Sequence, residues 1–100
     1  MEITAEKNND VNIIKIPNQL DVLTSTGLKQ VLLAVIEEEC NIELDFSSTV
    51  LVSSAGLRVL LQAEKSAKKA GKTITFTNVS PDVMEIFNIT GVNNIFTMRN

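Results

Sequence analysis

The sequence predicts an α/β domain with a mixed, mostly parallel sheet, and two observations lead to this class. Segments with strand patterns alternate with segments of helical spacing, in the order strand, strand, helix, strand, helix, strand, helix. Strands separated by helices are joined by right-handed crossovers, which make neighbouring strands parallel. One hundred residues are enough for one compact domain and too few for two. We therefore expect residues 1–100 to form a single domain, with helices packed on four to five strands.

The first part of the chain contains two strands and a helix. Residues 2–7 are typical of an edge strand, and residues 11–16 of a strand covered on both faces, because apolar groups fall on both sides. Turn-forming residues at 8–10 are expected to join these strands. The helix that follows Asp21 can take its N-cap from the hydroxyl residues 24–26. Its buried face is expected to consist of Leu28, Val31, Leu32, Val35 and Ile36.

The middle of the chain contributes a strand and the central helix. Residues 42–46 alternate apolar and polar side chains, which indicates a strand, and helical spacing covers residues 55–70. Gly71 is expected to end this helix, because a left-handed residue commonly follows the last turn. Glu64 and Lys68 have the spacing of a favourable ion pair on a helix. The inward positions are expected to be Leu57, Leu60, Leu61 and Ala67.

The last part of the chain contains a strand, a short helix and a tail. Residues 73–77 alternate as a strand with one buried face does. Residues 80–82 are Ser-Pro-Asp, which is a strong helix start with an N-cap, a proline and an acid. Gly91 is expected to break the chain before a final short segment at residues 92–98.

Composition and charge exclude several classes of partner. The net charge is −3 and the nine Lys and Arg residues form no stripe broken by aromatics, so we expect no direct nucleic-acid partner. No apolar run approaches the ~18 residues of a membrane span, so we expect no membrane insertion. The first ten residues do not resemble a signal peptide, and Cys40 is the only cysteine. These features favour a cytoplasmic protein.

The residues of common catalytic sites are missing. The chain contains no histidine, which removes the commonest general base and the commonest zinc ligand. Residues 66–73 are only superficially similar to a phosphate-binding loop, because Ser66 replaces its first glycine and the segment ends a helix. Asp45 lacks the accompanying acids and lysine of a phosphate-accepting receiver domain. We expect a protein that is not an enzyme and needs no metal or other cofactor.

The junction between a short apolar step, residues 50–52, and the central helix is the main candidate site. A hydroxyl at Ser53 or Ser54 can be exposed there, beside backbone N–H groups that favour an anion such as phosphate. Small side chains at Ala55 and Gly56 would let a second protein approach the backbone closely. A structural interpretation is also open, in which Ser53 or Ser54 caps the helix and Gly56 is small for packing.

Residues 45–47 and 50–60 resemble the signature of the STAS family, the sulfate transporter and anti-sigma factor antagonist domains. The resemblance extends from about residue 11 to residue 98. It implies the STAS fold, in which helices pack on a central, mostly parallel sheet. Weaker similarities lie outside the central segment, at residues 18–21 (in place of a Gly-x-Leu-Asp turn), 71–72, 89–92 and 95–96.

The resemblance implies a function in the bacterial anti-sigma factor antagonist branch. There, the serine at the position of Ser54 is phosphorylated by a partner anti-sigma factor serine kinase, and a PP2C-type phosphatase belongs to the same pathway. The preceding residue is often Asp but is Ser53 here, which leaves Ser53 as a competing acceptor. The implied partner-binding surface consists of Asp21, Ser53, Ser54, Ala55, Gly56, Leu57 and Arg58.

Other STAS-like domains act without phosphorylation, as subunits of lipid-transport systems or of larger signalling assemblies. Ser53, and Asn18 in place of a usual glycine, are compatible with that class. The resemblance therefore predicts an anti-sigma factor antagonist switched at Ser54, with a non-phosphorylated STAS subunit as the alternative.

Overall fold

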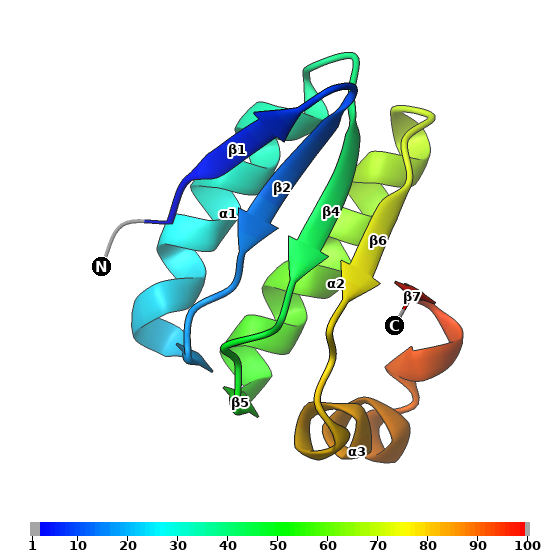
Figure 1. Cartoon of the computed structure of the whole chain (residues 1–100). Coiled ribbons are helices and arrows are strands. Elements are labelled where there is room, and N and C mark those ends of the chain that lie inside the picture. Colours follow the sequence, from blue (N-terminus) through cyan, green and yellow to red (C-terminus); the bar gives the residue numbers. More distant parts are fainter. Residues whose placement is uncertain (1–2, 100) are drawn as a thin grey trace.

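A five-stranded sheet forms the centre of the molecule, which is described by a computed structural model for residues 3–99 (Figure 1). All neighbouring strands are parallel except the first two, which form an antiparallel pair. In spatial order the strands are β1 (Ala5–Asn8), β2 (Val11–Lys15), β4 (Asn41–Asp45), β6 (Ile74–Thr77) and β7 (Thr97–Arg99). The helices are α1 (Val22–Ile36), α2 (Ser54–Lys69), α3 (Pro81–Thr90) and a single 3-10 turn, η1 (Val92–Asn94). The predicted α/β class with a mixed, mostly parallel sheet is confirmed.

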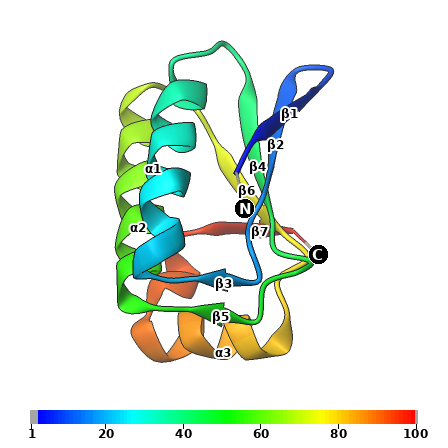
Figure 2. The same ribbon diagram turned by 90° about the vertical axis from the view of Figure 1, so that its left-hand side faces the viewer.

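The two long helices lie side by side on one face of the sheet, and no described helix covers the other face (Figure 2). Along β2, Asn12 and Ile14 are buried, whereas Val11 and Ile13 are only half-buried. The expectation that this strand is covered on both faces is therefore wrong. Its apolar residues on the second side remain partly open to solvent because α1 and α2 pack on the same face.

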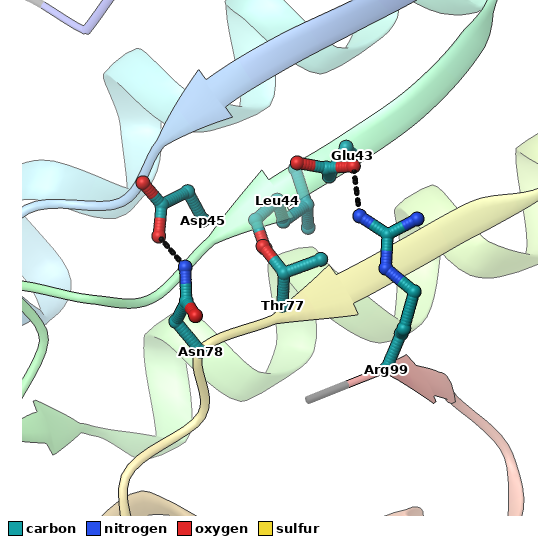
Figure 3. A network of polar contacts seen from close by, with 6 residues as sticks. All are labelled: Glu43, Leu44, Asp45, Thr77, Asn78 and Arg99. Carbon is teal, nitrogen blue, oxygen red and sulfur yellow. Dashed lines mark hydrogen bonds and ion pairs between the residues drawn. The ribbon is translucent and has the colours of Figure 1, made fainter.

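Polar side chains link β4 to the end of β6 and, across β6, to β7 (Figure 3). The guanidinium of Arg99 donates to Glu43 Oε1 at 2.6 Å, and Asn78 Nδ2 donates to Asp45 Oδ1 at 3.0 Å. The backbone N–H of Ser47 also donates to Asp45 Oδ1, at 2.9 Å. Partial burial acts to raise the pKa of Asp45, but the hydrogen bonds from Asn78 and Ser47 outweigh it and lower that pKa. Asp45 therefore has a structural role at the end of β4.

The ends of the elements follow the local signals in most places. Gly71 and Gly91 have left-handed backbones, with φ of 73° and 81°, and they follow α2 and α3 as predicted. Ser80 caps α3, because its hydroxyl accepts a backbone N–H of the first turn at 3.2 Å. The edge strand predicted at residues 2–7 begins at residue 5, and residue 2 lies outside the described residues. The tail predicted after Gly91 forms η1 and then the fifth strand, β7.

The four phenylalanines form one buried cluster that attaches α3 to the sheet. The rings of Phe46 and Phe76 stack with their centroids 5.3 Å apart, and Phe96 stacks on Phe76 at 4.3 Å. Phe87, from α3, meets Phe46 and Phe76 edge-on at 6.1 and 6.0 Å. Aromatic pairs contribute about 0.5–1.5 kcal/mol each beyond the area they bury. The cluster therefore holds α3 at the end of the sheet beside which α2 begins (Figure 1).

α2 buries one carboxyl group without a hydrogen-bond partner. Glu64 is only 6% exposed, and its Oε1 is unpaired among the described residues. Lys68 is exposed, and no ion pair joins it to Glu64 in that part of the chain, so the expected pair is not formed. Burial raises the pKa of Glu64, and the positive charge of Lys68 opposes this only in part.

Replacing Glu64 with glutamine should stabilise the protein, and the gain should increase with pH. Because the folded-state pKa lies above the reference value of 4.5, ionisation of Glu64 costs free energy in the folded state. The stability that neutral Glu64 contributes is therefore fully present below that reference value, and it is lost as pH rises through the folded-state pKa. Urea unfolding at about pH 4 and pH 7 measures the difference, with Glu85→Gln on the exposed side of α3 as a control. A Glu64→Gln protein less stable than the wild type at pH 7 would contradict this.

Candidate functional site

A second, two-stranded sheet brings the starts of α1 and α2 together. β3 (Gln19–Leu20) pairs in parallel with β5 (Leu51–Val52), with Leu20 opposite Val52. Each of these short strands runs directly into a helix, so the first turns of α1 and α2 lie side by side at one end of the molecule (Figure 2). The predicted site residues come from both segments and meet at this end.

The two serines at the start of α2 have different environments. Ser53 is the N-cap: its Oγ accepts the N–H of Gly56 at 3.4 Å, and its own N–H donates to Leu20 O at 2.8 Å. Ser54 is the first residue of the helix and is exposed. Within residues 3–99, the Ser54 hydroxyl takes part in no hydrogen bond. Of the two, Ser53 has the structural role and Ser54 has the free hydroxyl.

Gly56 is buried, and its small size serves packing inside the protein. A Cβ added at this position would lie 2.6 Å from Leu20 O and 2.7 Å from Leu20 Cγ. These distances are well below normal contact, and the first atom belongs to the backbone of β3. The expectation that Gly56 opens the backbone to a partner is therefore wrong, because β3 already occupies that space. The structural alternative for Gly56 is the correct one.

The remaining residues of the predicted partner-binding surface on α2 differ in their exposure to solvent. Ala55 and Leu57 are half-buried, and Leu57 packs against the core. Arg58 is exposed, one helical turn beyond Ser54 on the same face of α2. The part of α2 that a partner can reach in this region is therefore formed mainly by Ser54 and Arg58.

Asp21 is the N-cap of α1, which corrects the prediction that Thr24, Ser25 or Thr26 caps this helix. Its Oδ1 accepts the N–H groups of Leu23 and Thr24 at 3.0 and 3.1 Å. Thr24 Oγ1 accepts the N–H of Asp21 at 3.0 Å, which completes a capping box. The hydrogen bond from the Thr24 N–H lowers the pKa of Asp21 most, and the N–H of Leu23 adds to it. Asp21 therefore stabilises the start of α1 as its N-cap, in addition to any role in partner binding.

Replacing Asp21 with alanine should lower the stability of the protein, and asparagine should restore most of it, because both Asp and Asn cap helices. The folded-state pKa of Asp21 is lowered, so the contribution of its charge is present above the reference value of 3.8 and is lost as pH falls through the lowered value. Urea midpoints of the wild type, Asp21→Ala and Asp21→Asn at about pH 7 and pH 3 measure both effects. Equal midpoints for wild type and Asp21→Ala at pH 7 would refute the capping role.

Exposed apolar side chains lie at the same end of the molecule as Ser54, and the sequence analysis did not identify them. Val22 and Leu23, in the first turn of α1, are 69% and 85% exposed. Val50 and Leu51, which precede the Ser53 cap, are 54% and 42% exposed. These four residues, here called the apolar rim, lie at the end where β3 pairs with β5. A cluster of large exposed apolar side chains is typical of a protein-binding surface.

The site combines an exposed hydroxyl with exposed apolar side chains and a shallow groove. The chain has no histidine to activate Ser54, and the described residues contain no cluster of three or more potential metal ligands. Beside the apolar rim, a shallow groove is lined by Pro17, Asn18, Gln19, Asp21, Leu23 and Thr24. No helix within residues 3–99 has both the length and the apolar character needed to cross a membrane. The arrangement places one exposed hydroxyl, that of Ser54, at the end of the molecule where the apolar rim lies.

Fold and site together define a small α/β domain with an exposed apolar rim beside a helix start, and comparison with known proteins identifies its family. The model of the STAS domain family matches residues 2–100. The chain belongs to the STAS domain family. It is 26% identical to the anti-sigma-B factor antagonist of Bacillus subtilis, with 90% of this chain and 82% of the relative covered. It is 28% identical to BtrV of Bordetella bronchiseptica, whose name assigns it provisionally to the anti-sigma factor antagonists, with 100% and 87% covered.

Solved structures share the fold at lower sequence identity. An anti-sigma factor antagonist (STAS) domain protein from Planctomyces limnophilus superimposes with a TM-score of 0.87 at 16% identity, covering 99% of this chain and 89% of that one. The anti-sigma factor antagonist SpoIIAA, in its unphosphorylated form, has a TM-score of 0.76 at 15% identity, with 98% and 87% covered. These matches support the assignment of the STAS fold.

Proposed function

We propose that this protein is an anti-sigma factor antagonist that binds an anti-sigma factor through the surface around Ser54. The observation that carries the proposal is an exposed serine with a free hydroxyl beside the apolar rim. Val22 and Leu23 on one side, and Val50 and Leu51 on the other, offer apolar area that a partner can cover. The binding would occur in the cytoplasm and would release a sigma factor for transcription.

Phosphorylation of Ser54 would switch this binding off. The proposed kinase is the anti-sigma factor itself, and a PP2C-type phosphatase would reverse the reaction. Ser54 is favoured over Ser53 as the acceptor because the hydroxyl of Ser53 caps α2 and is half-buried, whereas that of Ser54 is exposed. A relative with this fold, SpoIIAA, has itself been solved in a phosphorylated form.

The proposed switch requires no refolding of the domain. A phosphate adds about −1.5 to −2 charges at neutral pH, and the start of a helix favours an anion. Within the free protein the phosphate on Ser54 is therefore tolerated. In the complex the same charge must be desolvated among the apolar side chains of the rim, which weakens binding.

Phosphate transfer to Ser54 is the direct test. The protein is incubated with ATP and the anti-sigma factor kinase encoded in the same genome, and the modified residue is located by mass spectrometry. We expect one phosphate on Ser54, none on Ser54→Ala, and one on Ser53→Asp, which preserves the helix cap. Phosphate on Ser53 alone would refute the assignment of the acceptor. Binding of the kinase without phosphate on either serine would favour the alternative of a non-phosphorylated STAS subunit.

A further inference from the structure

The outward side of α1 and α2 carries positive charge that the proposed switch does not use. Five of the nine basic residues lie between residues 58 and 72, although the net charge of the chain is −3. α1 contains no acidic residue, and the only acid of α2, Glu64, is buried. The exposed side of these helices is therefore positive up to the C-terminal end of α1, where the exposed Glu37, Glu38 and Glu39 follow.

The cations are arranged in a line along α2. Arg58, Lys65 and Lys69 are all exposed and are separated by seven and four residues, which places them on one face of the helix. At 1.5 Å per residue, their spacing along the axis is roughly 10 Å and 6 Å. Lys29 of α1 is exposed as well, across the groove between the two helices. We call Lys29, Arg58, Lys65 and Lys69 the basic face.

A shallow groove with Leu33 in its wall runs between Lys29 on one side and Lys65 and Lys69 on the other. Lys29, Leu33, Gln62, Lys65, Ser66 and Lys69 line its outer part. Below it, Leu32, Ile36, Val59 and Ala63 are buried in the packing between α1 and α2. Leu33 is 50% exposed, and no described element covers this side of α1 and α2 (Figure 2). The groove therefore offers one exposed apolar side chain, Leu33, with positive charge at its margin.

We propose that the basic face and this groove form a second docking surface, which binds an acidic amphipathic helix of a partner protein. Such a helix would place its apolar side chains over Leu33 and its carboxylates opposite Lys65 and Lys69. The four- and seven-residue spacing of the cations matches carboxylates that repeat on one face of a partner helix. Charge complementarity selects the partner, because the rest of this chain is predominantly acidic and would repel it. This surface shares Arg58 with the surface around Ser54, but its contacts at Leu33, Lys65 and Lys69 lie farther along the helices and do not depend on Ser54.

Titration with a synthetic peptide tests the proposal on the full chain. The probe is a helical peptide of about 18 residues, composed of Leu, Ala and Glu, with Leu on one face and Glu beside it. We expect amide chemical-shift changes centred on the groove, and binding that weakens steeply as salt is raised. The double variant Lys65→Glu/Lys69→Glu should bind the peptide at least about tenfold more weakly. The control Lys7→Glu/Lys15→Glu makes the same charge change on β1 and β2 and should bind within about twofold of wild type.

Several outcomes would overturn the proposal. If the amide chemical-shift changes are centred on the apolar rim, the peptide binds there and not in the groove. Another is equal weakening by the control variant, which would show an effect of net charge alone. Binding to phosphatidylserine vesicles without binding to the peptide would assign the basic face to a membrane surface. Ser54→Ala should bind the peptide as wild type does, so failure of the switch at Ser54 leaves this test unaffected.

Discussion

Replacing Gly56 with alanine should destabilise the protein by about 3 kcal/mol, the largest effect that we expect from a single methyl group. The added Cβ would lie 2.6 Å from the carbonyl oxygen of Leu20, and that oxygen also accepts the N–H of Ser53 at 2.8 Å. Relief of the contact must move β3 away from α2, which disrupts the pairing of β3 with β5. Urea unfolding should show the loss, together with a fall in Tm of more than about 10 °C.

A matched control is available in the other long helix. A Cβ added at Gly27 in α1 would meet only Ile3 Cδ1, at an ordinary contact distance of 3.9 Å. Gly27→Ala should therefore stabilise the protein by about 0.5–1 kcal/mol, the usual gain for this change within a helix. The opposite signs separate steric conflict at Gly56 from any general effect of replacing glycine. A Gly56→Ala protein as stable as the wild type would contradict the close contact between α2 and β3 described above.

Replacing Ser54 with aspartate should weaken binding to the anti-sigma factor about a hundredfold, which corresponds to ~2.8 kcal/mol. The carboxylate imitates part of the charge of a phosphate at the exposed start of α2, beside Val22, Leu23 and Leu51. In the free protein the charge lies near unpaired N–H groups, so the stability of the variant should be close to that of the wild type. Isothermal titration calorimetry with the purified anti-sigma factor measures the affinity, and urea unfolding measures the stability.

Two neighbouring variants show whether position and charge both matter. Ser54→Ala removes the acceptor without adding charge and should bind as the wild type does, with or without ATP. Ser53→Asp adds the same charge one residue earlier, where it replaces the existing cap and is partly neutralised by the first turn of α2. It should weaken binding less than tenfold. Similar losses for Ser53→Asp and Ser54→Asp would show that general repulsion, and not the contact at Ser54, is responsible.

Part of the candidate site could be predicted from local pattern, and part could not. The helix start at Ser53 and Ser54 follows from the change of periodicity after residues 50–52. The resemblance to the STAS family then selected Ser54. The apolar rim was missed because Val22 and Leu23 resemble the beginning of a buried helix face, and only their position beyond β3 exposes them. The basic face was missed because the cations of the chain were considered only as a possible nucleic-acid stripe.

Local sequence pattern alone was sufficient to predict the class of fold, the order of the helices and strands, and most of the positions where they begin and end. Alternation, helical spacing and the signals at Ser80, Gly71 and Gly91 depend on residues a few positions apart, so they can be recognised along the chain. The tertiary structure decided why position 56 must be glycine and that Glu64 is buried. Each of these depends on contacts between segments far apart in the sequence, such as β3 with α2. Long-range packing, rather than the local pattern, determines those contacts and brings Asp21 and Ser54 to the same end of the molecule.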